Sequence, residues 1–264
     1  MDLQLKGKKA LVTGSTAGIG FAAALALAAE GAAVIVNGRT QSRVDAAISN
    51  IKKAHPDSVV SGVAADVSNG PGCERLARAV PAVDILVNNM GIFEPKPFEQ
   101  ITDEEWLRFF EANVLSGVRL SRHYLPGMKQ KNWGRILFVS SESAVQIPAE
   151  MIHYGMTKTA QVAVARGIAE TTAGTGITVN SVLAGPTRSE GAEAFISQLS
   201  AQRGMDAAAF EREFFQSARP TSLLKRFAST DEVANMIVYL SSPLASATNG
   251  AAVRADGGVI RAIL

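Results

Sequence analysis

Lys9-Ala10-Leu11-Val12-Thr13 is a short apolar run, and Gly14-Ser15-Thr16-Ala17-Gly18-Ile19-Gly20 follows it directly. An alanine-rich segment continues to Glu30, so the order is strand, glycine turn and helix. Such a turn lets the backbone approach a phosphate closely, and the helix N-terminus offers free N–H groups at its positive dipole end. The stretch therefore predicts a dinucleotide-binding βα unit, with an ordinary βα turn as the alternative.

The same alternation continues along the chain. Apolar runs predict further strands at 33–37, 58–64, 83–87, 135–139, 176–183 and 251–254. Helices are predicted at 41–54, 70–79, 102–129 and 154–173 and from 229 onward, the third opening on a capping box formed by Thr102 and Glu105. Because the strands are apolar throughout, we predict an α/β fold, with one doubly wound, Rossmann-type, mostly seven-stranded parallel sheet and helices on both faces.

One domain is predicted for residues 1–264, with an insertion at about 188–222 where the alternation breaks. The insertion has helical apolar spacing at Phe195, Ile196, Leu199, Phe210, Phe214 and Phe215. Because ligands of open α/β sheets bind beyond the C-terminal ends of the strands, we interpret it as a lid over a substrate. A helical insertion packed on the body is the alternative.

Composition excludes several classes of protein. Of the 264 residues 47% are apolar and 19% charged, with a net charge of +2, so neither a disordered chain nor a nucleic-acid partner is indicated. The longest apolar stretch, 21–29, is too short to span a membrane, and the single Cys73 and a start without a signal core indicate a cytoplasmic protein. Three scattered histidines indicate no metal site.

Tyr154 and Lys158 are four residues apart, so on a helix they share one face. A nearby ammonium favours the phenolate and moves the phenol pKa toward neutral, as a proton-transfer group requires. A surface pair is the alternative. The second strand ends in Asn37-Gly38-Arg39 without a carboxylate, and the Arg39 guanidinium matches a 2′-phosphate, to which Asn37 and Thr40 offer neutral donors. NADP is therefore predicted over NAD; the alternative is that Arg39 only stacks on the adenine and both cofactors are used.

Together these motifs resemble the short-chain dehydrogenase/reductase family, in particular the 3-oxoacyl-acyl-carrier-protein reductases, over almost the whole chain. The matching residues are Thr13-Gly14-x-x-x-Gly18-x-Gly20, Asp66, Asn88-Asn89-Met90-Gly91, Asn113, Ser141, Tyr154-x-x-x-Lys158 and Asn180. The resemblance implies that Tyr154 is the general acid in ketone reduction and that Lys158 lowers its pKa and holds the nicotinamide ribose. It also implies that Ser141 binds the substrate oxygen and that Asn113 anchors a water of a proton relay.

The resemblance further implies the residues that bind the cofactor: Gly14, Thr16, Gly18, Ile19, Gly20, Arg39, Asp66, Val67, Asn88, Gly91, Tyr154, Lys158, Gly185, Pro186, Thr187 and Ser189. Asp66 and Val67 would contact the adenine, and residues 185–189 the carboxamide. A homotetramer built on the two long helices is implied as well, with Val162, Val164 and Ile168 as apolar positions and a dimer as the alternative.

The expected function is reduction of a mainly apolar ketone or 3-oxoacyl compound by NADPH. Besides the lid, the expected apolar wall comprises Ile92, Phe93, Ile147, Pro148 and Met151. The alternative is a non-catalytic dinucleotide-binding regulator or scaffold that retains the fold. Retention of Asn113, Ser141, Tyr154 and Lys158 together argues against it, and a serine hydrolase is excluded by the lack of a Gly-x-Ser-x-Gly elbow.

Overall fold

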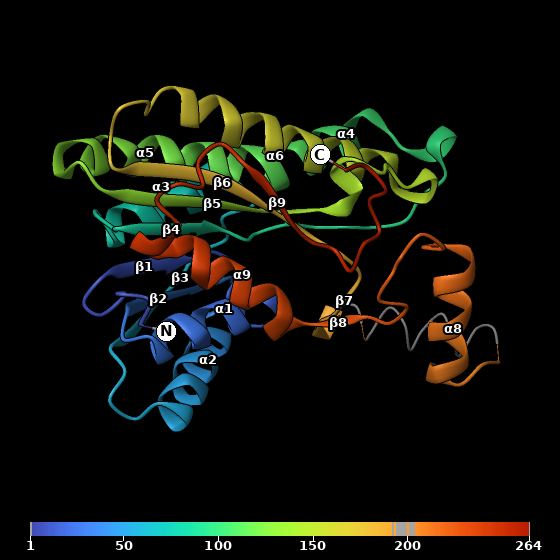
Figure 1. Ribbon diagram of the computed structural model, residues 1–264, viewed down its shortest axis with the longest axis horizontal. Helices are drawn as coiled ribbons and strands as arrows, with labels where there is room; N and C mark the ends of the chain where they lie inside the picture. Colours follow the sequence, from blue (N-terminus) through green and yellow to red (C-terminus); the bar gives the residue numbers. More distant parts are fainter. Residues whose placement is uncertain (1, 192, 194–199, 201–203, 264) are drawn as a thin grey trace.

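The computed structural model describes residues 2–191, 193, 200 and 204–263. In this part of the chain the main sheet has seven strands in the order β3-β2-β1-β4-β5-β6-β9, and every neighbouring pair is parallel (Figure 1). The strands are β1 Lys9–Val12, β2 Ala33–Gly38, β3 Val60–Ala64, β4 Ile85–Asn88, β5 Gly134–Ser141, β6 Ile177–Ala184 and β9 Ala252–Ala255. The predicted doubly wound fold is confirmed.

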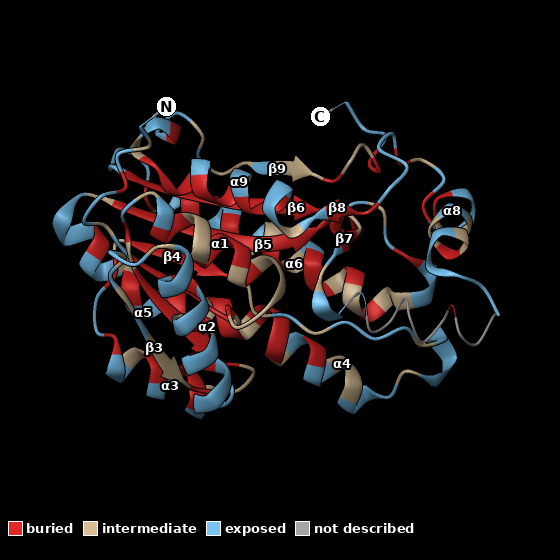
Figure 2. Cartoon of the chain, turned by 90° about the horizontal axis from the view of Figure 1, so that it is seen from below, coloured by how far each residue is buried: buried red, intermediate tan, exposed pale blue. Residues whose placement is uncertain are grey.

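Helices cover both faces of this sheet (Figure 1). One face carries α1 Gly18–Ala29, α2 Gln41–Ala54 and α9 Thr230–Ser241, and the other carries α3 Gly70–Ala79, α5 Ser116–Lys131 and α6 Ile152–Glu170. Short 3₁₀ turns lie at Phe98–Gln100, Glu142–Ala144, Ala149–Met151 and Pro243–Ala245. All residues of β4, β5 and β6 are buried, which explains why their sequences are apolar without alternation (Figure 2).

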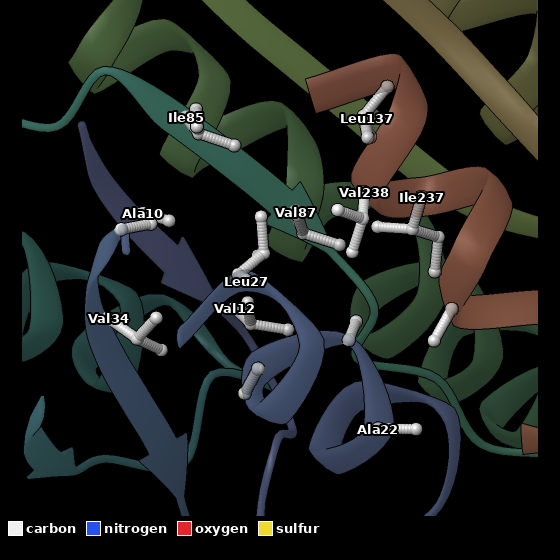
Figure 3. Close-up of a cluster of buried hydrophobic side chains, with 14 of the residues drawn as sticks. Ala10, Val12, Ala22, Leu27, Val34, Ile85, Val87, Leu137, Ile237 and Val238 are labelled. Atoms are coloured by element: carbon white, nitrogen blue, oxygen red, sulfur yellow. The ribbon is translucent and has the colours of Figure 1, made fainter. Parts of the chain in front are cut away.

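The core between the sheet and the first helix layer is tightly packed. Leu27 of α1 and Ile237 and Val238 of α9 lie against Val12 of β1 and Val87 of β4 (Figure 3). Strand order reverses between β1 and β4, because the chain runs from β1 outward to β3 and then returns to β4. Ligands of such sheets bind at this reversal, beyond the C-terminal strand ends.

The predicted helix 102–129 is interrupted. It consists of α4 Asp103–Phe110, a π-helical turn Glu111–Leu115 and α5, which ends where Asn132 takes a left-handed conformation (φ 50°). The predicted capping box of Thr102 and Glu105 is present. A π turn inserts one residue into the helical repeat, so the apolar spacing alone did not reveal it, and such turns are frequent at functional sites.

A second, two-stranded sheet was not predicted. β7 Thr187–Arg188 pairs in parallel with β8 Ala228–Ser229, and α8 Ala207–Ser217 lies between them along the chain (Figure 1). Phe210, Phe215 and Phe227 form a buried cluster of their own in this region. Of the apolar positions expected in the insertion, Phe195, Ile196 and Leu199 lie outside the described residues.

Gly72 of α3 and Gly127 of α5 differ in the space that surrounds them, and substituting each by alanine tests how closely α3 is packed. A Cβ on Gly72 would lie 1.7 Å from the carbonyl oxygen of Asp66, whereas a Cβ on Gly127 of α5 would have no described atom within 4 Å. We expect Gly72→Ala to lower the free energy of unfolding by roughly 2 kcal/mol or more, because backbone must move. Gly127→Ala should raise it by about 0.5–1 kcal/mol. Urea unfolding followed by circular dichroism measures both; equal effects would contradict this packing.

Candidate active site

The glycine turn after β1 is held against the loop that follows β4. Gly14 and Gly18 both have φ of +59°, a conformation that favours glycine. Asn89 Nδ2 donates to the carbonyl oxygens of Thr13 at 2.9 Å and Gly14 at 3.0 Å. A Cβ on Gly20 would lie 2.4 Å from that amide nitrogen. The third glycine is therefore required for contact between helix and loop.

The N-terminus of α1 is open to a ligand. Among the described residues no side chain caps this helix, since the N-cap position is Ala17, whereas α4 and α9 both have capping boxes. The first N–H groups of α1 thus lack side-chain partners, and no acidic residue lies in its first turn. A pyrophosphate fits such a site, because it would satisfy these donors at the positive end of the helix dipole.

Of the two side chains at the end of β2 that could bind a 2′-phosphate, Asn37 is held by the fold and Arg39 is exposed. Asn37 is 1% exposed; its amide donates to the carbonyl oxygens of Val63 and Ala65 at 3.1 and 3.0 Å, and its oxygen accepts from Gly14 N at 3.2 Å. The prediction that Asn37 is a donor for a 2′-phosphate is therefore wrong, because both amide hydrogens serve the fold. Arg39 is exposed, and its guanidinium has no partner among the described residues.

Ser141, Tyr154 and Lys158 come together because α6 packs on β5. Ser141 is the last residue of β5, and Ser140 Oγ donates to the carbonyl oxygen of Lys158 at 2.8 Å. Lys158, 5% exposed, donates from Nζ to the carbonyl oxygen of Val139 at 2.9 Å. The same Nζ lies 5.5 Å from the centroid of the Tyr154 ring. The three residues predicted to take part in proton transfer thus lie together at the end of the sheet.

Asn113 lies in the π turn, and its side chain fixes the loop after β4. Its Oδ1 accepts from Ile92 N at 2.7 Å, and its Nδ2 donates to the Ile92 carbonyl oxygen at 3.0 Å and to Thr157 Oγ1 at 2.9 Å. Gln161 Nε2 donates to the Asn113 carbonyl oxygen at 2.7 Å, and Gln161 Oε1 accepts from Lys158 Nζ at 3.1 Å. Gln161 therefore links Lys158 to Asn113, a role that the sequence analysis missed.

Burial controls the charges of the central pair. It raises the pKa of Tyr154, and the Glu142 carboxylate raises it further, while the Ser141 hydroxyl and the Arg219 guanidinium act in the opposite direction. Burial lowers the pKa of Lys158 to about 8, partly offset by Glu142. Burial and Glu142 thus outweigh Ser141 and Arg219 in their effect on the Tyr154 pKa, and the lowering of this pKa by Lys158 stays a prediction.

A buried ion pair beside Ser141 is the main feature missed from the sequence. Glu142 and Arg219 are 4% and 7% exposed, and Arg219 Nε donates to Glu142 Oε1 at 2.8 Å. Arg219 Nη1 donates to Glu150 Oε1 at 3.2 Å, and Ser141 Oγ donates to Glu142 Oε2. Glu142 could have been suspected from its place beside Ser141. Arg219 gave no signal, because it lies 77 residues away in the chain.

These groups border a pocket of about 410 Å³. Of the predicted site residues, ten line it: Gly18, Ile19, Gly91, Ser141, Tyr154, Lys158, Gly185, Pro186, Thr187 and Ser189. The others lie outside its lining: Gly14, Thr16, Gly20, Arg39, Asp66, Val67, Asn88 and Asn113. Asn88 is 3% exposed and donates to Ser121 Oγ at 3.2 Å, so it supports the cleft from within the core.

The predicted apolar wall is met in part. Phe93, Met151, Phe210 and Phe214 line the pocket, together with Phe227, which was not predicted. Ile92, Ile147 and Pro148 do not line it, and Phe215 is buried in the cluster with Phe227. Phe93 meets Tyr154 edge to face, with ring centroids 6.4 Å apart.

A tyrosine and a lysine at the C-terminal ends of the strands of a doubly wound sheet, in one pocket with an uncapped helix N-terminus, define a dinucleotide-dependent oxidoreductase. A family model described as "Enoyl-(Acyl carrier protein) reductase" matches residues 14–260. The oxidoreductases YvrD and YvaG of Bacillus subtilis (strain 168) are 50% and 48% identical over 266 and 263 residues, covering 100% of each chain. L-Sorbose reductase from Gluconobacter frateurii, solved with NADPH and L-sorbose, has a TM-score of 0.94 at 31% identity, with 100% of both chains covered. The chain belongs to the short-chain dehydrogenase/reductase family.

Proposed function

We propose that this protein reduces a ketone with a mainly apolar body, or a 3-oxoacyl compound, with NADPH, and oxidises the corresponding alcohol in reverse. The observation that carries the proposal is the pocket in which Ser141 and Tyr154 face an aromatic wall of Phe93, Phe214 and Phe227. Such a wall favours a carbonyl compound with an apolar chain. The NADPH bound to L-sorbose reductase supports the choice of cofactor.

The proton step belongs to the chain itself. NADPH, when bound, supplies the hydride that the carbonyl carbon receives. Ser141 turns its hydroxyl hydrogen from Glu142 Oε2 to the carbonyl oxygen, and Tyr154 Oη gives its proton to that oxygen, so that an alcohol forms and the phenolate regains a proton from solvent. Because burial raises its pKa, the Tyr154 phenol is protonated at neutral pH, which suits reduction. Lys158 holds the nicotinamide ribose and supplies positive charge next to the phenolate.

The cofactor would lie along the C-terminal ends of the strands. The glycine turn and the N-terminus of α1 hold the pyrophosphate, Asp66 and Val67 contact the adenine, and residues 185–189 hold the carboxamide. Four of the last group, Gly185, Pro186, Thr187 and Ser189, line the same pocket as Tyr154, which supports this placement. The proposed order along the cleft places the exposed Arg39 at the adenosine end.

Residues 188–222 act as the lid of a single domain. Phe210 and Phe214 of α8 and Arg219 after it line the pocket from this segment, which supports its role over the substrate.

The single cysteine, Cys73, is a buried free thiol, which is compatible with a reducing cytoplasm. Within the described residues no helix is long and apolar enough to cross a membrane.

Assembly into a homotetramer through α5 and α6 is proposed by family resemblance. Val164 and Ile168 pack partly into the core of their own subunit, so the outward face of α6 is formed instead by Ala163, Arg166, Gly167 and Glu170. We expect light scattering at micromolar concentration to give four times the mass of the 27.7 kDa chain. A mass of one chain would refute assembly, and a mass of two would identify the dimer.

Consumption of NADPH tests the function. The purified protein is mixed with NADPH and a panel of aliphatic ketones and acyl thioesters, and absorbance of the nicotinamide is followed, with NADH as the comparison. Oxidation of NADPH by ketones with apolar chains is expected. If NADPH binds but no carbonyl compound is reduced, the protein is a dinucleotide-binding regulator, and the enzymatic proposal fails.

A further inference from the structure

The buried pair of Glu142 and Arg219 lies beside the residue that would hold the substrate oxygen. Glu142 follows Ser141 directly, and Ser141 Oγ donates to Glu142 Oε2. Ser143 N and Oγ also contact that oxygen, at 2.9 and 3.2 Å. Ser143 N and Oγ still engage Glu142 Oε2 when the Ser141 hydroxyl turns to a carbonyl oxygen. Among the described residues, Oε1 accepts only from Arg219 Nε, at 2.8 Å. A carboxylate oxygen can accept a second.

The guanidinium of Arg219 likewise has hydrogen-bonding capacity that is not satisfied by the described residues. Its Nε and Nη2 form the edge that usually binds both oxygens of a carboxylate, but Oε2 of Glu142 is occupied by Ser141 and Ser143. Nη1 donates to Glu150 and to the Ala218 carbonyl oxygen, at 3.2 and 2.8 Å. Nη2 makes no hydrogen bond to any residue that the structure describes. Arg219 lines the pocket, so this donor is available to a ligand there.

A donor and an acceptor thus stand together next to Ser141. A hydroxyl group can donate to Glu142 Oε1 and accept from Arg219 Nη2 at once, and no purely apolar or acceptor-only group can do both. A carboxylate is disfavoured, because one guanidinium already serves the two carboxylates of Glu142 and Glu150. The position beside Ser141 places the bound hydroxyl next to the carbonyl group.

We propose that Glu142 and Arg219 form a subsite for a hydroxyl group on the carbon next to the reacting carbonyl, so that the substrate is a neutral α-hydroxyketone with an apolar tail. This inference rests on the proposed function, since it assumes that Ser141 holds a carbonyl oxygen. The polar subsite and the aromatic wall then bind opposite ends of one molecule. Glu142 and Arg219 determine specificity, while Tyr154 performs the proton transfer.

Three butyl ketones that differ only in the second group on the carbonyl carbon test the subsite: hydroxymethyl, ethyl and carboxylate. Calorimetry with the NADP⁺-loaded protein should give binding of the hydroxymethyl ketone about ten- to a hundredfold tighter than of the ethyl ketone, the usual effect of a hydrogen bond to a charged group. The carboxylate should bind most weakly. With NADPH, kcat/KM should follow the same order.

Arg219→Lys keeps a charge for Glu142 but removes the Nη2 donor, so the preference for hydroxymethyl over ethyl should fall to about threefold or less while the ethyl ketone is still reduced. Arg226→Lys is the matched control, because Arg226 forms an exposed ion pair with Glu232 and does not line the pocket. It should retain the preference.

Equal affinity of wild type for the hydroxymethyl and ethyl ketones would overturn the subsite, whether or not Arg219→Lys folds. Reduction of both ketones at equal rates would leave the proposed function standing and the subsite refuted. Preferential binding of the hydroxymethyl ketone without NADPH oxidation would refute the proposed function alone, and no binding of any of the three would refute both.

Discussion

Tyr154→Phe is expected to lower kcat for ketone reduction by about two to four orders of magnitude, the usual contribution of a positioned general acid. The ring and its contact with Phe93 remain, so the loss reports on the hydroxyl alone. Affinity for NADPH and the unfolding temperature should change little. Stopped-flow absorbance at the nicotinamide band measures the rate, and fluorescence titration measures binding.

Tyr239→Phe is the matched control for this substitution. Tyr239 lies on α9, is 40% exposed and is not part of the pocket, so the Tyr239→Phe variant should have the kcat of wild type. A Tyr154→Phe variant with near-wild-type turnover would show that another group delivers the proton. Burial keeps the Tyr154 phenol protonated through neutral pH, so the reduction rate of wild type should be high there. The rate should fall as pH rises through about 8, because Lys158 then loses the charge that stabilises the phenolate.

Arg39→Ala should reduce kcat/KM with NADPH by about ten- to a hundredfold and leave the value with NADH almost unchanged, because a charge-assisted contact contributes roughly 1.5–3 kcal/mol. Arg39 stands at the end of β2, where no carboxylate is available for a ribose 2′-hydroxyl. Since Asn37 is engaged in the fold, Arg39 carries the expected discrimination with little help. Steady-state kinetics with both cofactors measure the effect.

Arg43→Ala is the control that distinguishes a specific contact between Arg39 and the 2′-phosphate from the general attraction of a positive charge for the cofactor. Arg43 is an exposed cation on the next helix, and its Nη2 pairs with Glu190 at 3.3 Å. Its removal should change the ratio of NADPH to NADH efficiency by about threefold or less, as for other surface charges. Similar losses in the two variants would indicate only a diffuse positive potential, and a wild-type preference for NADH would contradict the assignment.

The sequence revealed the sheet because its signals are local. The glycine turn, the unbroken apolar runs and the capping box at Thr102 each depend on neighbouring residues, and the structure has the predicted fold. The π turn at Glu111–Leu115 was missed, since it shifts the helical repeat by one residue without a marker such as proline. Gln161 was missed although it is three residues beyond Lys158, because its bond to Asn113 depends on the packing of α6 against the π turn.

The polar part of the site was the hardest to predict. Glu142 and Arg219 meet only after the chain has crossed the sheet and formed α8, so neither spacing nor composition relates them. The aromatic residues of α8 suggested an apolar pocket, and four of the eight expected wall residues that the structure describes line it. Charges buried in pairs are visible only in three dimensions, because a sequence does not reveal which carboxylate neutralises which guanidinium.

The pairing of β7 with β8 affects how freely the segment between them can change. Thr187 lies opposite Ala228 and Arg188 opposite Ser229, so both ends of the intervening chain are fixed to each other at the rim of the main sheet. For a loop with joined ends, each doubling of length costs only about 0.6 kcal/mol. We expect insertions and deletions there to leave the nucleotide cleft and Tyr154 in place. Directed libraries confined to residues 190–218, which leave Ser189 and the buried ion pair of Arg219 with Glu142 unchanged, should therefore yield new substrate specificities.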